Sequence, residues 1–239
     1  MPIRTLHIDI EGGWGGSSRS LFELTSKFHP NQIYPVIAHR QKGPISKRYK
    51  KIGIQSHHMP EIFSYAPKLR VKNFKNFIAS LPKMLELPKI INKIINMVRL
   101  YKIQIIHLNY EGLFIMAKLL KEKLNVPIIC HSRTQIPDDI FGRYLVKTLS
   151  KNVDHIFFIS PQEKKRFCRI EMGSKVSKSI MWNISAKKKG GRLKRTSEVV
   201  YFGDISPDKG TDRLIDIAKE LESEKEITIA VYGTERSKK

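Results

Sequence analysis

The sequence predicts an α/β protein with a doubly wound parallel sheet, followed by the first βαβ unit of a second domain of the same kind. Three observations predict this fold class. Short apolar runs are bounded by turn residues, segments of helical periodicity alternate with them, and a basic stretch without apolar periodicity separates two such series. At 239 residues, 41% of them hydrophobic, the chain can form one sizeable core and part of a second.

The strand candidates of the first series are short runs rich in β-branched residues. They lie at 6–10, 33–38, 54–58, 103–108, 127–130 and 154–159. The helix candidates between them each carry an apolar stripe that can lie on a sheet. They lie at 20–28, 88–101, 113–124, 139–149 and 162–168. In such folds the carboxyl ends of the strands meet at one edge of the sheet, where ligands bind.

A second series follows the basic stretch. We expect a first domain over 1–184, an interdomain linker over 185–197 and the incomplete start of a second domain over 198–239. The elements predicted in this last part are a strand, a helix and a strand at 198–202, 211–221 and 227–232. One such βαβ unit cannot bury both faces of its own sheet.

The charge of the chain is strongly unbalanced, since 44 Lys and Arg oppose 22 Asp and Glu and leave a net charge of +22. This excess predicts an anionic partner. Residues 68–102 contain nine Lys and Arg and a single acid, Glu86, among apolar and aromatic residues. Two interpretations stay open: docking on an anionic membrane surface, or a core-packed helix pair with a solvated lysine face. Specific nucleic-acid binding is not predicted, because the sequence has no recognition-helix, RNP-like or zinc-finger pattern.

Cysteine usage and hydropathy indicate the compartment. Cys130 and Cys168 have no metal-ligand spacing around them, which favours a reducing compartment over a disulfide scaffold. The sequence contains no signal-peptide pattern and no run of about 18 apolar residues. We therefore expect a cytoplasmic protein, attached peripherally to the inner face of the membrane if the basic segment docks there.

A glycine-rich segment, Gly12 to Ser18, lies directly after the first predicted strand. Glycines let the backbone turn tightly and approach a ligand, and the N-terminus of the following helix offers free amides to an anion. The glycine spacing differs from the dinucleotide-binding fingerprint. We favour a ligand-binding loop here; a glycine-rich turn with a serine cap and no ligand is the alternative.

A second strand–turn–helix connection runs from Tyr201 to Asp212. Thr211 or Asp212 can cap the helix that follows, and Lys209 would be a point charge for a phosphate. Taken alone, a loop of this kind is more often only a connection.

Six segments follow one another in a recognisable order. They are the glycine-rich loop, IQIIHLN, VPIICHSRT, VDHIFFISPQEKKRF, IMWNIS and VVYFGDISPDKGTDRLIDIAKEL. Their order and spacing resemble family 4 glycosyltransferases over nearly the whole chain, most specifically at 199–221. The resemblance implies the GT-B fold of two Rossmann-like domains. It also implies a retaining sugar transfer from a nucleoside-diphosphate donor to a surface polysaccharide or lipid-linked glycan, with no cofactor and no obligatory metal.

By position, the resemblance implies that Gly15 and Gly16 flank the donor phosphates, and that Gly203 and Lys209 belong to the donor site. Asp204 stands where the family usually has arginine, and the family's Glu-x7-Glu signature would lie beyond the last residue. An alternative therefore stays open: a non-catalytic acceptor- or membrane-docking module, either a remnant or one half of an enzyme completed by a second subunit.

Two predicted strands end in polar pairs. Many family members have a histidine near the reacting carbon at the end of the strand that begins here at Pro127, where either His131 or Arg133 can stand. Both side chains point to the same side at the carboxyl edge, so we predict them as catalytic contacts. His107 and Asn109 end the preceding strand, and we predict them on the acceptor side. A structural role is the alternative for each pair.

Overall fold

The computed structural model describes residues 1–13, 15–64, 85–171, 173, 175–183, 198–203, 205, 210–221 and 228–232. The chain divides into two compact units, Met1–Ala186 and Lys187–Lys239. The predicted linker at 185–197 lies outside the described residues, and so do Asp204 and Lys209.

The first unit is built on a parallel sheet of seven strands in the order β3-β2-β1-β4-β5-β6-β7. The strands are β1 (Ile3–Asp9), β2 (Ile33–His39), β3 (Gln55–His58), β4 (Ile105–Leu108), β5 (Ile128–Ser132), β6 (His155–Phe158) and β7 (Ser177–Ile180). The chain starts in the middle of the sheet and winds outward first one way and then the other. This is the doubly wound α/β arrangement, so the predicted fold class is confirmed.

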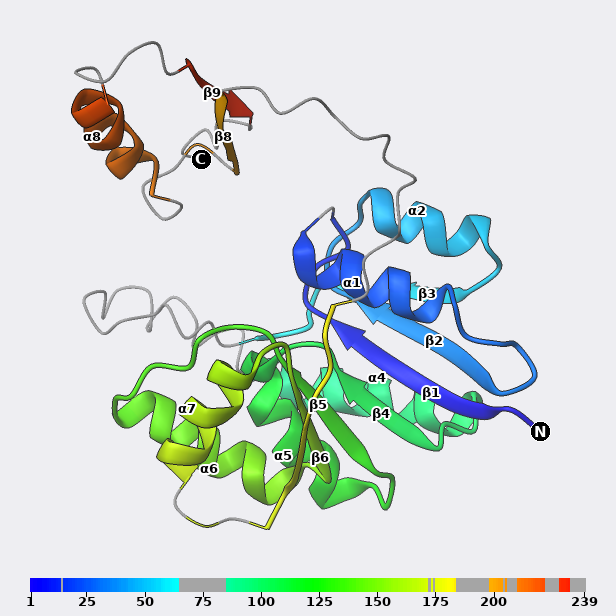
Figure 1. Ribbon diagram of the computed structural model, residues 1–239. Helices are drawn as coiled ribbons and strands as arrows, with labels where there is room; N and C mark the ends of the chain where they lie inside the picture. The colour runs from blue at the N-terminus through cyan, green and yellow to red at the C-terminus, as the bar shows by residue number, and fades with distance from the viewer. Residues whose placement is uncertain are drawn as a thin grey trace. The chain divides into compact units, whose positions relative to one another are not determined.

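Helices cover both faces of this sheet. They are α1 (Gly16–Thr25), α2 (Pro44–Lys51), α4 (Leu87–Leu100), α5 (Phe114–Lys123), α6 (Ile140–Asn152) and α7 (Pro161–Glu171), with a 3₁₀ turn, η2 (Glu111–Leu113). Figure 1 shows α1 and α2 on one side of the sheet and α5, α6 and α7 on the other. Helices α4 to α7 pack against one another in chain order. The sequence predicted all of these helices except α2, and all of the strands except β7.

The main hydrophobic core lies between the sheet and helices α4 to α7. The apolar stripe of α4, predicted from its spacing, is at most 8% exposed; it comprises Ile90, Ile91, Ile94, Ile95 and Val98. Burial of each of these side chains stabilises the fold by about 1.5–3 kcal/mol. For the described part of the basic segment, 85–102, the apolar side is therefore core and the lysine side is solvated, whereas 68–84 lie outside the described residues.

The second unit contains strands β8 (Glu198–Phe202) and β9 (Thr228–Tyr232) and helix α8 (Thr211–Leu221). The two strands pair in parallel, from Glu198 opposite Thr228 to Phe202 opposite Tyr232. Their bounds agree with the predicted ones to within one residue. On α8, Ile215 and Ile217 are 60% and 45% exposed.

Candidate functional site

Polar side chains converge where β1, β4 and β5 end. Asp9 is the last residue of β1, Asn109 follows β4 and Arg133 follows β5. The register pairs Ile8 with Leu108 and Leu108 with Cys130, so the three strands end at the same level of the sheet. The sequence placed Asn109 and Arg133 at this edge, and the structure brings them into contact.

Asn109 is the centre of this contact and is completely buried. Its Oδ1 atom accepts hydrogen bonds from Nε and Nη2 of Arg133 at 3.0 and 2.6 Å, and its backbone oxygen accepts a third from Nε at 3.1 Å. Its Nδ2 atom donates to Oδ1 of Asp9 at 3.0 Å and to the backbone oxygen of Ser17 at 3.3 Å. Asn109 therefore connects the end of β5 to the start of α1.

Asp9 holds the first turn of α1 against the sheet. Its Oδ2 atom accepts a hydrogen bond of 2.5 Å from Oγ of Ser18. Burial raises the pKa of Asp9, while its bonds to Ser18 and Asn109 oppose that rise. The carboxyl group thus fixes the helix whose N-terminus faces the glycine-rich loop.

The glycines of that loop differ in the space that surrounds them. A Cβ atom on Gly12 would lie 1.8 Å from the backbone oxygen of Gln41, and one on Gly15 would lie 2.0 Å from Oε2 of Glu11. Close packing against backbone therefore requires glycine at position 12, whereas at position 15 the Glu11 side chain could move aside. A Cβ on Gly16, the first residue of α1, would have no heavy atom within 4 Å. Since the first amides of a helix have no partner inside the helix, the open space beside Gly16 suits an anion.

Glu111, in η2, is a buried carboxyl group beneath the β5–α6 connection. Its Oε2 atom accepts a hydrogen bond of 2.7 Å from the backbone N–H of Arg133, and Oε1 accepts one from Oγ1 of Thr134. Burial raises the pKa of Glu111 to about 7, although these bonds oppose the rise. Burial also lowers the pKa of Arg133 to about 10, which leaves the guanidinium charged at neutral pH. The site therefore combines a permanent cation with a carboxyl group that titrates near neutrality.

His131 lies beside Arg133, with its Nδ1 atom 3.4 Å from Nη2 of the guanidinium. Burial, and then the positive charge of Arg133, lowers the pKa of His131 to about 3. The imidazole is accordingly neutral at physiological pH. The ring is 2% exposed and carries no charge at that pH.

His107 faces another histidine across the sheet. Its Nδ1 atom is 2.9 Å from Nδ1 of His7, and Nε2 of His7 is 2.9 Å from Oγ1 of Thr5. The ring centroids of His7 and His107 are 5.1 Å apart, and those of His107 and His131 are 5.8 Å apart. A row of three buried histidines thus crosses β1, β4 and β5, and hydrogen bonding between strands explains the position of His107.

The chain that leaves β7 is tied to the same edge by Asn183. Its Oδ1 atom accepts hydrogen bonds from Nη1 of Arg133 at 3.1 Å and from Oγ of Ser20 at 2.8 Å. Arg133 therefore contacts β4 through Asn109 and the exit of the first unit through Asn183.

Several groups of this site were not predicted as site residues from the sequence. They are Asp9, Ser18, Glu111, Thr134 and Asn183. Asp9 ends β1 and Glu111 follows closely after β4. The criterion that pointed to Asn109, a polar residue at the carboxyl end of a predicted strand, could therefore have pointed to both. The remaining contacts depend on strand order, which the sequence does not display. Of the predicted donor residues in the second unit, Gly203 donates its backbone N–H to Tyr232 at 3.1 Å, and Lys209 lies outside the described residues.

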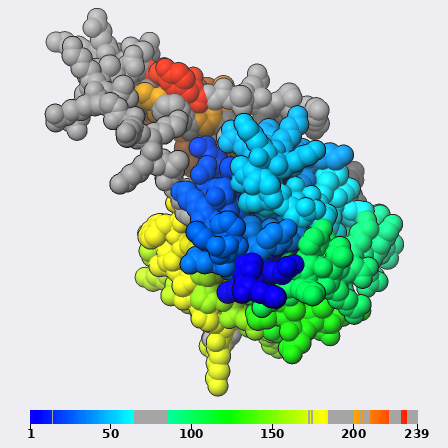
Figure 2. Space-filling model, turned by 90° about the vertical axis from the view of Figure 1, so that its right-hand side faces the viewer, coloured from blue at the N-terminus to red at the C-terminus, as the bar shows by residue number. Residues whose placement is uncertain are grey.

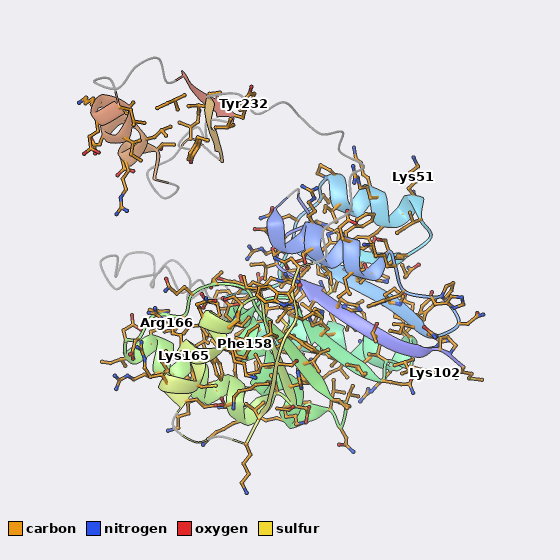
Figure 3. The ribbon with its side chains drawn as sticks, in the orientation of Figure 1. Lys51, Lys102, Phe158, Lys165, Arg166 and Tyr232 are labelled. Carbon is orange, nitrogen blue, oxygen red and sulfur yellow. The ribbon has the colours of Figure 1, made fainter. Side chains whose placement is uncertain are left out.

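Exposed lysines also lie away from this edge. Figure 3 labels Lys51 on α2, Lys102 after α4 and Lys165 on α7, all of them exposed. Among the described residues, no three His, Cys, Asp or Glu side chains are grouped so that they could hold a metal ion. None of the described helices has the length and apolar character that a bilayer-spanning helix needs.

The family model of Glycosyltransferase Family 4 matches residues 14–177, which is more than half of the chain. The chain therefore belongs to glycosyltransferase family 4. The comparison with curated protein sequences gave no match.

Solved structures share the fold at low sequence identity. HepE from Anabaena, in complex with UDP, is 12% identical, with 96% of this chain and 62% of that chain covered and a TM-score of 0.63. Sucrose-phosphate synthase from Thermosynechococcus elongatus is 14% identical, with coverages of 97% and 62% and a TM-score of 0.62. The lipopolysaccharide outer core galactosyltransferase WaaB is 12% identical, with coverages of 96% and 68% and a TM-score of 0.62. These likenesses show the Rossmann-like GT-B fold, and the chain spans 62% of the length of HepE.

Proposed function

We propose that the chain acts in the transfer of a sugar from a nucleoside-diphosphate donor to a glycan acceptor, either a surface polysaccharide or a lipid-linked glycan. Membership of glycosyltransferase family 4 over residues 14–177 is the observation that carries the proposal. The UDP held by HepE, which has the same fold, supports a nucleotide donor. Exposed cations on the first unit would suit the anionic membrane surface on which a lipid-linked acceptor lies.

The donor diphosphate would lie beside Gly16. The departing diphosphate gains negative charge, which helix amides, lysine and arginine can stabilise without a metal ion. The N-terminus of α1 offers such amides next to open space. On the family resemblance, we assign Gly15 to the same loop, and Gly203 and Lys209 to the donor side of the second unit.

Two roles follow for the polar edge. On the family resemblance, we assign His131, which is neutral at physiological pH and 2% exposed, to the reacting end of the donor. Most N–H groups of Arg133 donate hydrogen bonds to Asn109 and Asn183, and Nη2 also lies beside His131. We therefore assign Arg133 to positioning His131. Asn109, and His107 behind it, would shape the floor of the acceptor side.

Isothermal titration of the full chain with UDP, GDP and UDP-glucose tests the donor site. A leucine at position 16 fits the fold but fills the space beside the helix amides. We expect Gly16→Leu to weaken nucleotide binding at least tenfold and Lys209→Ala to weaken it as well. Lys27→Leu, which puts the same side chain just beyond the other end of α1, should leave binding unchanged.

The opposite result would favour the non-catalytic alternative. If the folded chain bound none of these nucleotides, the donor role would be wrong, and an acceptor- or membrane-docking module would be the better account. Equal binding by wild type and Gly16→Leu would place the nucleotide away from α1.

A further inference from the structure

A polar groove lies at the edge of the sheet opposite the candidate site. It has a volume of about 530 Å³ and is lined by Asn92, Ile95, Asn96 and Arg99 of α4 and by Lys123 of α5. Lys123 ends α5 and Arg99 is in the last turn of α4, and each helix leads directly into the start of its strand, β4 or β5. Figure 2 looks onto this edge, where the beginning of β1 in dark blue adjoins the green residues of the α4–α5 region.

The lining combines charge with hydrogen-bonding amides. Asn92, Asn96 and Arg99 are spaced by four and three residues, so they share one side of α4. The guanidinium of Arg99 and the ammonium of Lys123 are the two groups that proteins most often use to bind phosphate. Carboxamides both donate to and accept from hydroxyl groups. Ile95, 8% exposed, provides an apolar floor.

Neither cation of the groove forms an ion pair with a described acid, unlike two other lysines of α4 and α5. Lys93 contacts Glu61 at 2.5 Å, and Lys121 contacts Asp154 at 2.8 Å. In the described part of the chain, neither Arg99 nor Lys123 forms an ion pair, and no acid is among the residues that line the groove. An anion entering the groove would therefore meet two cations that form no ion pair with a described carboxylate.

We propose that this groove binds a phosphate group carried by a hydroxyl-rich molecule, either a sugar phosphate in solution or the phosphate-bearing headgroup of a lipid. The volume falls within the range of about 300–1,000 Å³ typical of small-molecule sites. The groove lies at the strand starts and the candidate donor site at the strand ends, so this proposal does not depend on the proposed function.

NMR of the full ¹⁵N-labelled chain tests the groove directly. Glucose 1-phosphate is expected to shift the side-chain amide signals of Asn92 and Asn96 saturably, inorganic phosphate more weakly, and glucose not at all. The double variant Arg99→Gln/Lys123→Gln should bind at least tenfold more weakly. The matched control Lys147→Gln/Lys151→Gln removes two exposed lysines from α6 and should bind as wild type does.

Sedimentation with vesicles distinguishes the two sources of the phosphate. Vesicles of phosphatidylglycerol and of phosphatidylcholine present an anionic and a zwitterionic surface. Loss of phosphatidylglycerol binding in the groove variant alone, without a response to glucose 1-phosphate, would support the lipid headgroup. The proposal is overturned if neither probe depends on Arg99 and Lys123, or if the α6 control loses as much binding as the groove variant.

Discussion

Replacement of Glu111 by glutamine tests whether a carboxyl group titrates inside the site near neutral pH. Burial raises the pKa of Glu111 from its ordinary value of 4.5 to about 7. Because the folded-state pKa is the higher one, the group's contribution to stability is complete below pH 4.5 and is lost as the pH rises through 7. Glutamine keeps the size of the side chain and an oxygen for the N–H of Arg133, but it does not titrate.

The size of the effect follows from the two pKa values. The difference between 4.5 and about 7 corresponds to about 3.4 kcal/mol, of which about 2.5 kcal/mol falls between pH 5 and pH 8.5. Urea unfolding followed by circular dichroism gives the free energy of unfolding at both pH values. All other groups titrate in both proteins, so the difference between variant and wild type isolates Glu111. From pH 5 to pH 8.5, we expect the free energy of unfolding of Glu111→Gln to rise by about 2.5 kcal/mol relative to that of wild type.

Glu122→Gln is the matched control. The side chain of Glu122 lies on α5, is 53% exposed and contacts Lys118 at 4.0 Å. Removal of this exposed charge should change the free energy of unfolding by less than about 0.5 kcal/mol, because exposed ion pairs contribute little. If Glu111→Gln gave a change as small as the control, or a change of the opposite sign, Glu111 would ionise in the folded protein without cost. The reasoning from burial would then be wrong.

Three further substitutions give expected changes in the same unfolding assay. Burial lowers the folded-state pKa of His7 from 6.5 to about 3, so its contribution to stability is present above pH 6.5 and is lost on acidification. His7→Gln should therefore reduce the loss of unfolding free energy between pH 8 and pH 5 by about 2 kcal/mol. Gly12→Ala places a methyl group 1.8 Å from the backbone oxygen of Gln41 and should cost about 2 kcal/mol or more. Glu171→Gln removes the carboxylate that contacts Lys178 at 2.6 Å, where the side chains are 4% and 13% exposed, and should cost about 3 kcal/mol.

Each of these substitutions has a control at an exposed position. For His7→Gln the control is His29→Gln, which removes an exposed histidine. Gly16→Ala should change stability by less than about 0.5 kcal/mol. Lys121→Gln breaks an exposed contact and should cost less than about 1 kcal/mol. A substitution that changed stability no more than its control would contradict the packing, pairing or burial assigned to it.

Apolar patterning was sufficient for the elements that build the core. The stripe of α4 repeats at helical spacing, and β1 and β2 each contain a short run dominated by apolar residues, so the positions of these elements could be predicted. Helix α2 was missed because only Ile45 and Tyr49 are buried in it, among four cations. Strand β7 was missed because its sequence, Ser-Lys-Ser-Ile, has one apolar residue and lies at the edge of the sheet.

The candidate site could be predicted only as far as strand ends reveal it. His131, Arg133 and Asn109 follow apolar runs, and their shared edge follows from the parallel sheet. The partners of Asn109 could not be inferred, because Asp9 becomes its neighbour only when β1 pairs with β4. Burial of Glu111 is likewise a product of tertiary packing, so the rise in its pKa has no signature in the sequence.

The central position of β1 also links the site to the order in which the chain is synthesised. One edge of β1 can pair with β2 soon after both strands are synthesised, but its other edge can pair only after β4 has been synthesised. The hydrogen bond between Asp9 and Asn109 closes a separation of 100 residues. Contacts so distant in sequence form late, because closing a long loop costs conformational entropy before the contact stabilises the chain. A nascent chain in which β4 has not yet emerged from the ribosome can therefore contain helix α1 and the glycine-rich loop, but not the polar edge where Asp9 meets Asn109.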